Sequence, residues 1–296
     1  MPAVACLIAN PERHPLDPRL VAEAARALEG EARWLGEAAA VEIRCGAIEP
    51  AEAAQRLDEL VAGEPVDRAV LPAGHRRKRL LLCDMDSTII TIECIDELAD
   101  FAGLKERIAA VTRRAMNGEL DFAAALRERV ALLTGLPEGV IDRVIAERLR
   151  LMPGAATLVR TMRAHGAFAG LVSGGFTRFT RHVQALCGFD LEEANELEVA
   201  DGVLTGRLAG ELRGAEAKLA ALVRLRGELG IAPEETLAVG DGANDLPMLR
   251  EAGLGVAFRA HERVRAAAPC RIEHGDLTAL LYLQGYRRDE FAAADR

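Results

Sequence analysis

The sequence lacks any long hydrophobic run. No apolar stretch approaches the ~18 residues of a membrane span, so we expect no membrane association. The amino terminus lacks the basic region and apolar stretch of a signal peptide. The six cysteines are scattered, with no CxxC pair and no zinc-ligand spacing. Together these absences predict a cytoplasmic protein whose thiols are free.

Basic charge is also scarce. The 296 residues include 37 Lys and Arg against 46 Asp and Glu, a formal net charge of −9. No basic stripe follows the chain, which argues against a nucleic-acid partner. The one basic cluster, residues 75–79, is short and directly precedes an apolar segment, so we interpret it as a solvated linker. No Walker-type glycine loop is present, so nothing indicates a nucleoside triphosphate site.

Half of the residues are hydrophobic, and the length allows one large domain or two ordinary ones. The first part, residues 1–75, predicts a small α/β domain with strands at 4–8, 40–44 and 66–71 and helices at 17–28 and 50–61. It contains no catalytic cluster, which favours a packing, dimerisation or ligand-sensing role. The run Leu71-Pro72-Ala73-Gly74 then breaks the structure and marks a boundary.

The second part, residues 76–296, alternates strands with helices, except for a helical segment at 92–150. That segment, in which Asp121 is a plausible N-cap, follows the first strand and is predicted to form a cap. The core would then comprise residues 76–91 and 151–296. Alternation of this kind predicts a Rossmann-like, doubly wound parallel sheet with right-handed crossovers. Its predicted elements are strands at 80–83, 167–172, 236–239, 255–258 and 271–273, helices at 158–165, 179–187 and 215–228, and a hairpin at 197–206.

The sharpest motif is the pair Asp84 and Asp86, which follows the apolar run Leu80–Cys83. Residues i and i+2 of a strand face the same way, so both carboxylates can meet at its carboxyl end. Ligands of open α/β sheets bind at that end. Two carboxylates there must bind a cation or share a proton, and oxygen ligands favour Mg²⁺.

Two more polar clusters, Ser173-Gly174-Gly175 and the run 240–245, also follow apolar segments of strand length. In a parallel sheet all such ends lie on one rim, so the clusters should converge. Ser173 and the glycine backbone suit an anion, and Lys218 can direct a positive charge to it. Asp241 adds a third acid for the metal, while Asn244 and Asp245 can support the ligands from behind.

These parts suit a phosphoryl group, whose transfer needs positioning and charge neutralisation. Asp84 is the predicted nucleophile, forming an aspartyl phosphate. Asp86 is predicted to protonate the leaving alcohol and then to activate water.

At this point the sequence resembles the haloacid dehalogenase phosphatase superfamily and, within it, the phosphoserine phosphatases. The resemblance covers roughly residues 77–283, about 70% of the chain, and includes the motifs above in order. The narrower resemblance rests on the predicted cap, in the runs Glu93–Glu97 and Asp121–Leu133. Longer bacterial members carry an ACT-like α/β domain before the phosphatase domain, and the strand–helix alternation of residues 1–75 is similar to it.

The resemblance implies a role for each site residue. Mg²⁺ would bind Asp84, the Asp86 carbonyl and Asp241. Ser173, Gly174 and Lys218 would hold the phosphate. Glu93 would meet the substrate's ammonium and Arg129 its carboxylate, with Phe122 closing the cap over them. Asn244 would contribute to the substrate site and Asp245 would brace it.

The expected activity is hydrolysis of O-phospho-L-serine to L-serine and phosphate, the last step of serine biosynthesis. One alternative is phosphatase or phosphotransferase action on another small phosphomonoester, such as phosphohomoserine. Another is a non-catalytic regulator that binds an amino acid, although four intact site residues count against it. The expected partner is a small-molecule substrate, and a homodimer is an open expectation.

Overall fold

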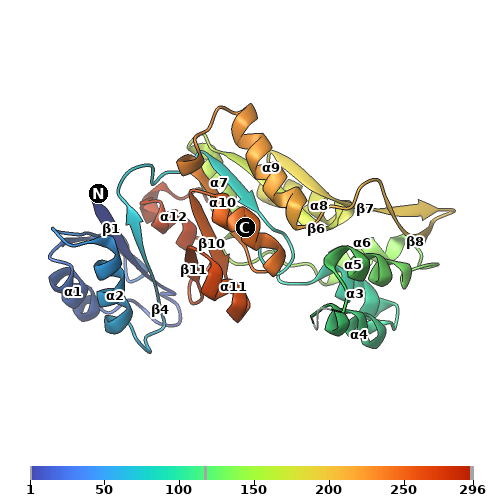
Figure 1. The fold of residues 1–296 in the computed structure, drawn as a ribbon, viewed down its shortest axis with the longest axis horizontal. Coiled ribbons are helices and arrows are strands. Elements are labelled where there is room, and N and C mark those ends of the chain that lie inside the picture. Colours follow the sequence, from blue (N-terminus) through green and yellow to red (C-terminus); the bar gives the residue numbers. More distant parts are fainter. Residues whose placement is uncertain (1, 117–118, 294–296) are drawn as a thin grey trace.

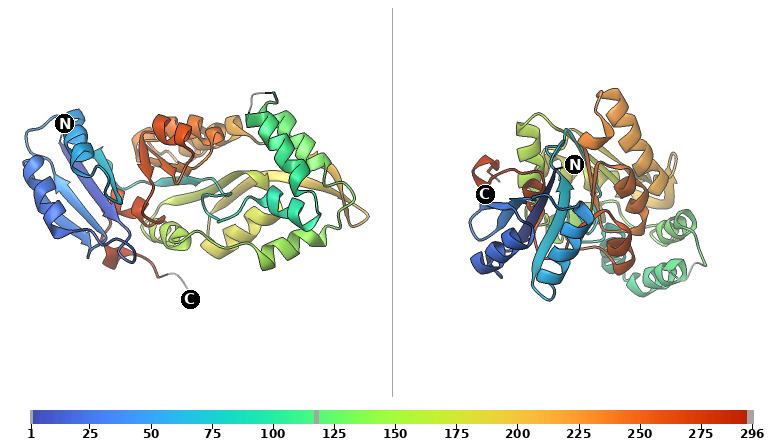
Figure 2. Two further views of the ribbon diagram at one scale, coloured as in Figure 1. Left: turned by 90° about the horizontal axis from the view of Figure 1, so that it is seen from below. Right: turned by 60° about the vertical axis from the view of Figure 1, so that its left-hand side comes forward.

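The computed structural model describes residues 2–116 and 119–293, and it contains two β-sheets (Figures 1 and 2). A four-stranded sheet with two helices lies at one end of the molecule. A seven-stranded sheet flanked by helices forms the middle, and a group of helices covers the far end. Within the described residues, no helix is both long and apolar enough to cross a membrane.

The amino-terminal sheet has a βαββαβ order of elements. These are β1 (Ala3–Ala9), α1 (Pro18–Ala27), β2 (Glu31–Gly36), β3 (Ala40–Arg44), α2 (Pro50–Leu60) and β4 (Val66–Pro72). The strand order is β2-β3-β1-β4, and every neighbouring pair is antiparallel. This order and connectivity are those of a ferredoxin-like unit. Helix α1 begins as expected, because the Asp17 side chain accepts a hydrogen bond from the Arg19 N–H, 2.8 Å away.

Both faces of β1 are buried. Successive side chains point to opposite faces, so alternate residues of the strand belong to two different hydrophobic cores. Ala5 and Leu7 pack with the inner faces of α1 and α2. Cys6 and Ile8 point the opposite way and join the main core, where they pack with residues of α12 (Ala279–Leu283). The amino-terminal sheet therefore lies between its own helices and the larger unit.

Asp67 of β4 stabilises the contact between the amino-terminal sheet and the larger unit through its buried carboxylate. It is 4% exposed and accepts hydrogen bonds from the backbone N–H groups of Glu273 and Gly275, both at 2.7 Å. The His274 N–H lies 3.1 Å from the same carboxylate. Three backbone donors of the segment after β11 (Cys270–Ile272) thus depend on one side chain of the other sheet.

We expect Asp67→Ala to lower the free energy of unfolding by about 3 kcal/mol, because buried N–H groups would lose their acceptors. Urea denaturation followed by circular dichroism would measure this loss. Asp58→Ala removes an exposed carboxylate that pairs with Arg68, and it should cost less than about 1 kcal/mol. Equal, small effects of the two changes would contradict the anchoring role of Asp67.

The larger sheet has the strand order β11-β10-β9-β5-β6-β7-β8 and is parallel except for the final β7–β8 pair. Its remaining strands are β5 (Leu80–Cys83), β6 (Phe168–Phe176), β7 (Leu191–Ala200), β8 (Val203–Ala209), β9 (Thr236–Gly240) and β10 (Leu254–Phe258). Helices cover both faces. They are α7 (Ala155–Ala164) and α8 (Thr177–Cys187) with α12 on one face, and α9 (Ala215–Glu228), α10 (Leu246–Glu251) and α11 (Glu262–Ala267) on the other.

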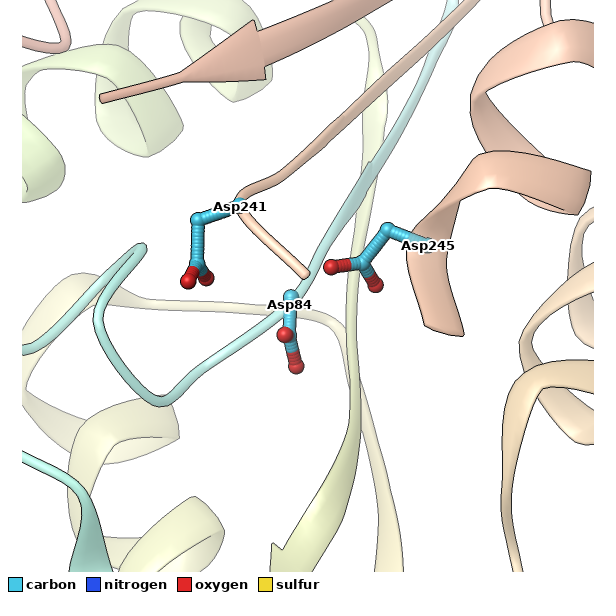
Figure 3. A group of neighbouring side chains, drawn as sticks. All are labelled: Asp84, Asp241 and Asp245. Atoms are coloured by element: carbon cyan, nitrogen blue, oxygen red, sulfur yellow. The ribbon is translucent and has the colours of Figure 1, made fainter. Parts of the chain in front are cut away.

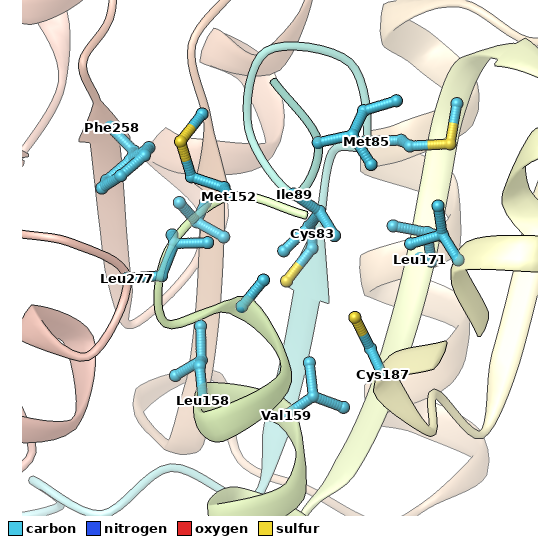
Figure 4. Packing of buried hydrophobic residues seen from close by; sticks show 14 of the residues in the cluster. Cys83, Met85, Ile89, Met152, Leu158, Val159, Leu171, Cys187, Phe258 and Leu277 are labelled. Carbon is cyan, nitrogen blue, oxygen red and sulfur yellow. The ribbon is translucent and has the colours of Figure 1, made fainter. Parts of the chain in front are cut away.

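The central strand β5 shows why both faces are covered. Leu81 and Cys83 pack with Leu158 and Val159 of α7 on one side (Figure 4). Leu80 and Leu82 point to the other side and pack with residues of α9 and α10, including Leu222. All four residues of β5 are fully buried, as expected for an inner strand of a doubly wound parallel sheet.

The segment predicted to be a cap, residues 92–150, contains four helices among its described residues. They are α3 (Cys94–Phe101), α4 (Lys105–Met116), α5 (Phe122–Ala131) and α6 (Gly139–Glu147). The α5–α6 connection pairs with the β7–β8 hairpin through backbone hydrogen bonds from Gly135 N to Leu204 O and from Leu204 N to Leu136 O, both 2.8 Å. Arg178 of α8 adds a two-point ion pair to Asp142 of α6, at 2.6 and 2.7 Å. The cap is therefore held to the sheet at its outer edge.

The structure differs from the sequence prediction at a few elements. Strand β2 was not predicted, because it is an edge strand whose first four residues are exposed and show no alternation. Residues 173–175 were expected to follow a strand, but β6 continues through them to Phe176, which is 2% exposed. Three short carboxyl-terminal helices, α10 to α12, were not predicted. Helix α9 spans the expected residues 215–228.

Candidate active site

The two carboxylates of the sharpest motif lie beyond the end of β5, at the carboxyl rim of the sheet. The Asp84 N–H donates to Val239 O of β9 at 3.0 Å, which continues the sheet pairing to that residue. The chain then turns at Ser87, whose φ of 54° lies in the left-handed region. This turn directs the chain back to Glu93, and the Ser87 hydroxyl donates to the Glu93 carboxylate at 2.6 Å.

Lys218 lies at the centre of the charged cluster. Its Nζ is 2.7 Å from Asp84 Oδ1 and 2.6 Å from Asp245 Oδ1, and its side chain is 1% exposed. Helix α9 presents Lys218 to the rim one turn after the helix begins. Despite burial, which lowers the pKa of an amine, the charges of Asp245 and Asp84 raise the pKa of Lys218 above its ordinary value. The lysine is therefore a fixed positive charge.

Asp84, which follows β5, and Asp241 and Asp245, which both lie in the turn after β9, can place one oxygen each within 4.8 Å of one another (Figure 3). Asp245 is held by Lys218 and by the Gly242 N–H, which lies 3.0 Å from Asp245 Oδ2. Asp245 also lies against Gly240, where an added Cβ would be 2.3 Å from Asp245 Cγ, so only glycine fits there. The Thr88 hydroxyl donates to Asp241 Oδ1 at 2.8 Å.

This donor set fits a hard divalent cation. Three carboxylates face one ammonium, which leaves two negative charges without a partner in the cluster. Burial and the neighbouring Asp245 raise the pKa of Asp84 well above its ordinary value, and burial raises the pKa of Asp241 to about 6. Oxygen-only ligands with excess negative charge are typical of Mg²⁺ or Ca²⁺ sites. The acidic cluster could therefore hold a metal ion.

Asp86 has surroundings of its own. It accepts a hydrogen bond from the Cys94 thiol, with 2.9 Å between Sγ and Oδ1. Burial, followed by the negative charge of Glu93, raises the pKa of Asp86 to about 7. A carboxyl group with such a pKa can both donate and accept a proton near neutral pH.

The backbone of residues 173–175 forms the side of the site next to Asp86. The Gly175 N–H donates to Ser173 Oγ at 2.9 Å, and a Cβ added at Gly175 would lie 3.2 Å from Asp86 Oδ2. Asn195 of β7 supports this segment, because its Nδ2 donates to Gly174 O at 2.8 Å. Asn195, Thr88 and Cys94 were not predicted as site residues. Thr88 belongs to the Asp84 motif and could have been found from it, whereas the sequence around Asn195 carries no such signal.

The cap contributes three predicted residues. Glu93 is the N-cap residue of α3, yet its carboxylate bonds to Ser87 and not to the helix backbone. Arg129 of α5 is half-buried; its Nε donates to Ala125 O at 3.4 Å, and it forms no ion pair with any residue in the described part of the chain. Burial lowers the pKa of Arg129, while nearby Asp96, Glu93 and Asp86 act in the opposite direction. The Arg129 guanidinium therefore lies within electrostatic reach of the site's carboxylates.

Phe122, the first residue of α5, covers the backbone at Gly174 and Gly214. Its ring lies against Gly174 and Gly214, where an added Cβ would be 3.1 Å from ring atoms at either position. The Phe122 side chain is 37% exposed. Asn244 is half-buried, with its side-chain oxygen against Gly242. The structure thus brings the predicted residues to one rim, with the cap residues above it.

Comparison with known proteins agrees with this geometry. The family model of haloacid dehalogenase-like hydrolases matches residues 81–250, more than half of the chain. The chain belongs to the haloacid dehalogenase-like hydrolases. The matched segment of this hydrolase runs from β5 to α10 and contains Asp84, Lys218 and Asp245.

Named relatives of this hydrolase are phosphoserine phosphatases. A phosphoserine phosphatase of Streptomyces coelicolor is 46% identical over 258 residues, which are 86% of this chain and 63% of the relative. The chain thus spans less than two thirds of that relative's length. A probable phosphoserine phosphatase of Vibrio cholerae, solved in unliganded form, has a TM-score of 0.77 and 32% identity, covering 98% of this chain and 88% of that one.

A third relative bears on the chemistry. It is a solved phosphoserine phosphatase described as a phospho-aspartyl intermediate analogue, with a TM-score of 0.65 and 39% identity. The match covers 70% of this chain and 98% of that chain.

Proposed function

We propose that this hydrolase converts O-phospho-L-serine and water to L-serine and phosphate, the last step of serine biosynthesis. The observation that carries the proposal is the buried trio of Asp84, Lys218 and Asp245, joined by contacts of 2.6 and 2.7 Å at the rim where Asp86 and Ser173 also lie. Such a cluster suits a nucleophilic carboxylate that receives a phosphoryl group. The named relatives give the substrate class.

Mg²⁺ is the proposed cofactor. Asp84, Asp241 and the Asp86 carbonyl would hold it. Asp245, which contacts Lys218, would support these ligands. When bound, Mg²⁺ would neutralise charge on the phosphoryl oxygens. The support from the structure is the oxygen-only donor set and its excess of negative charge.

The two oxygens of Asp84 differ in a way that suits a nucleophile. Oδ1 accepts hydrogen bonds from Lys218 Nζ at 2.7 Å and from the Met85 N–H at 2.7 Å. Oδ2 accepts no hydrogen bond from residues 2–116 or 119–293 and is free to attack phosphorus. Its lone pair forms the new O–P bond as the bond from phosphorus to the serine oxygen breaks. Lys218 and the Ser173–Gly175 backbone stabilise the charge of the transferred group.

Asp86 would manage the protons in both halves of the reaction. Its carboxyl group gives a proton to the departing serine oxygen and becomes a carboxylate. That carboxylate then takes a proton from the water that attacks the phosphorus of the aspartyl phosphate, which releases phosphate and restores Asp84. The pKa of about 7 at Asp86 supports both roles.

The cap would select the amino-acid part of the substrate. Glu93 suits the ammonium group, Arg129 the carboxylate, and Phe122 would exclude water above the phosphate. Asn244 would complete the substrate side of the site. The Arg129 guanidinium is half-buried, forms no ion pair within the described residues and lies within electrostatic reach of Glu93, which supports this division of roles.

The decisive experiment measures kcat/KM with Mg²⁺ for phosphoserine, phosphothreonine, phosphohomoserine and an aryl phosphate. We expect a clear preference for phosphoserine. Equal activity on all four would keep the aspartate chemistry and reject the substrate. Phosphoryl transfer to added homoserine would indicate a transferase, and no turnover on any of them would support an amino-acid-binding regulator.

We expect Arg129→Ala to raise KM for phosphoserine about 30-fold, because a charge-assisted hydrogen bond contributes about 2 kcal/mol. The aryl phosphate lacks a carboxylate, so its KM should change little. Steady-state kinetics on both substrates test this, with Arg127→Ala as a control on an exposed position of the same helix. Equal losses on both substrates would mean that Arg129 binds phosphate or supports the fold.

The division of the chain belongs to the same proposal. Residues 1–75 would form an ACT-like domain that regulates the enzyme or joins a homodimer. Residues 76–296 would form the phosphatase, with the cap at 92–150. The ferredoxin-like strand order of the first unit supports this assignment. A cytoplasmic location is supported by six free cysteines, five of them buried.

A further inference from the structure

Asn195 on β7 is a buried amide with three hydrogen bonds to backbone groups. Its Nδ2 donates to Gly174 O at 2.8 Å and to Arg213 O at 3.1 Å. Its Oδ1 accepts from the Arg213 N–H at 2.7 Å. The residue is 2% exposed, and both amide donors are used. The Asn195 side chain therefore bonds to both backbone polar groups of one residue and to one carbonyl of another.

The two segments that Asn195 joins hold the phosphate-binding groups. Gly174 follows Ser173 in the backbone that borders Asp86. Arg213 directly precedes Gly214, the N-cap residue of α9, and the Lys218 N–H bonds to Gly214 O at 3.3 Å in the first turn. One amide thus couples the start of the lysine-bearing helix to the Ser173–Gly175 backbone.

Sheet pairing does not supply this coupling. Val172 pairs with Glu193 and Phe176 with Asn195, so residues 173–175 lie opposite Ala194 alone. This bulge frees the backbone of residues 173–175 from the regular ladder. The Gly174 carbonyl then needs another donor, and the Asn195 side chain provides it.

The same two segments support the cap. The Phe122 ring rests on Gly174 and Gly214, one from each segment. Because Asn195 joins the two segments, a shift of one would displace the other. The Ser173–Gly175 backbone, the start of the helix that carries Lys218 and the surface beneath Phe122 would then move together.

We propose that Asn195 is a positioning residue that sets the separation between the Ser173–Gly175 backbone and Lys218, and thereby the fit of the site to the transferred phosphoryl group. Its side-chain hydrogen bonds within the described residues go to backbone groups of Gly174 and Arg213, not to Asp84, Asp86 or Lys218. The inference rests on the proposed phosphatase activity but not on phosphoserine as the substrate. Misplacement of catalytic groups by about 1 Å can cost about 10²-fold in rate, which is the scale expected here.

The test compares Asn195→Ala and Asn195→Asp with the control Glu196→Gln, a change at the neighbouring, exposed position. The aspartate keeps the size of the side chain but loses both donors and places a carboxylate against two carbonyl oxygens. Turnover is measured with Mg²⁺ on phosphoserine and on an aryl phosphate, and inorganic phosphate serves as a product inhibitor. Near-UV circular dichroism checks that each variant is folded at the assay temperature. Asn195→Ser serves as the second variant if alanine prevents folding.

We expect kcat to fall about 10²-fold on both substrates by the same factor, with phosphate inhibition weakened about tenfold. The KM ratio of the two substrates should not change, because the cap residues that read the amino acid remain. Folded variants with kcat and phosphate inhibition within twofold of the wild type would overturn the proposal. So would a loss confined to phosphoserine, which would place the effect in the cap. If the wild type hydrolyses only the aryl phosphate, the substrate assignment fails while the Asn195 test still stands on that substrate.

Discussion

Asp84→Asn should abolish turnover, with kcat lowered at least about 10⁴-fold, because an amide oxygen is a poor nucleophile for phosphorus. The substitution keeps the shape of a side chain that is only 6% exposed, so the fold should persist. Acid quenching after mixing with an aryl phosphate labelled with ³²P would detect the phosphoenzyme. We expect labelled protein from the wild type and none from the variant.

Asp86→Asn provides a matched control for this experiment. An aryl leaving group needs little protonation, so Asp84 should still accept the phosphoryl group in this variant. The attacking water would lack its base, and the phosphoenzyme should accumulate after a burst of aryl alcohol. A labelled intermediate in Asp84→Asn would disprove the nucleophile assignment. No burst in Asp86→Asn would show that Asp86 acts mainly in the first step.

The part of the site that sequence reasoning could predict is the part that lies directly at strand ends. Strands β5, β6 and β9 are neighbours in the sheet, as the parallel alternation required, so their polar ends converge. Asp84 and Asp241 were placed at this rim in this way, whereas Ser173 lies within β6, which continues to Phe176. Lys218 was predicted to lie in a helix over residues 215–228, and the structure confirms those bounds.

Residues that act through tertiary pairing could not be predicted in this way. Asn195 lies in a strand where a polar residue is usually solvent-exposed, and only the bulge of β6 gives it a buried partner. Strand β2 could not be predicted from its sequence pattern. Its first four residues, including Trp34, are all exposed, so the strand lacks the alternation of buried and exposed positions. The Asp67 anchor joins residues more than two hundred positions apart, for which no local signal exists.

The close contact of Asp245 with Lys218 also changes the interpretation of the acidic cluster. Sequence reasoning placed Asp245 behind the ligands, and the structure brings its carboxylate within the same 4.8 Å group as Asp84 and Asp241. Lys218 is the one cation that contacts Asp84 and Asp245 within the described part of the chain. Its charge therefore matters for stability as well as for catalysis.

Lys218→Met should lower the free energy of unfolding by about 3–5 kcal/mol in the absence of divalent cations, because it leaves buried carboxylates without their counter-ion. It should also lower kcat about 10³-fold, since a fixed charge near the transferred phosphoryl group is lost. Added Mg²⁺ should raise the melting temperature more in this variant than in the wild type, because binding would supply the missing positive charge. Differential scanning calorimetry with and without Mg²⁺ would measure the two effects on stability, and steady-state kinetics the loss of kcat.

The double variant Lys218→Met/Asp245→Asn separates stability from catalysis. Removing one carboxylate relieves repulsion in the cluster, so stability should partly return, while kcat should stay low because no ammonium faces the phosphate. Lys218 Nζ lies 2.6 Å from Asp245 Oδ1, so the effects of the two single changes on the free energy of unfolding should be strongly non-additive. Additive effects, or a Lys218→Met variant with unchanged melting temperature and no added response to Mg²⁺, would show that the lysine does not balance the acidic cluster.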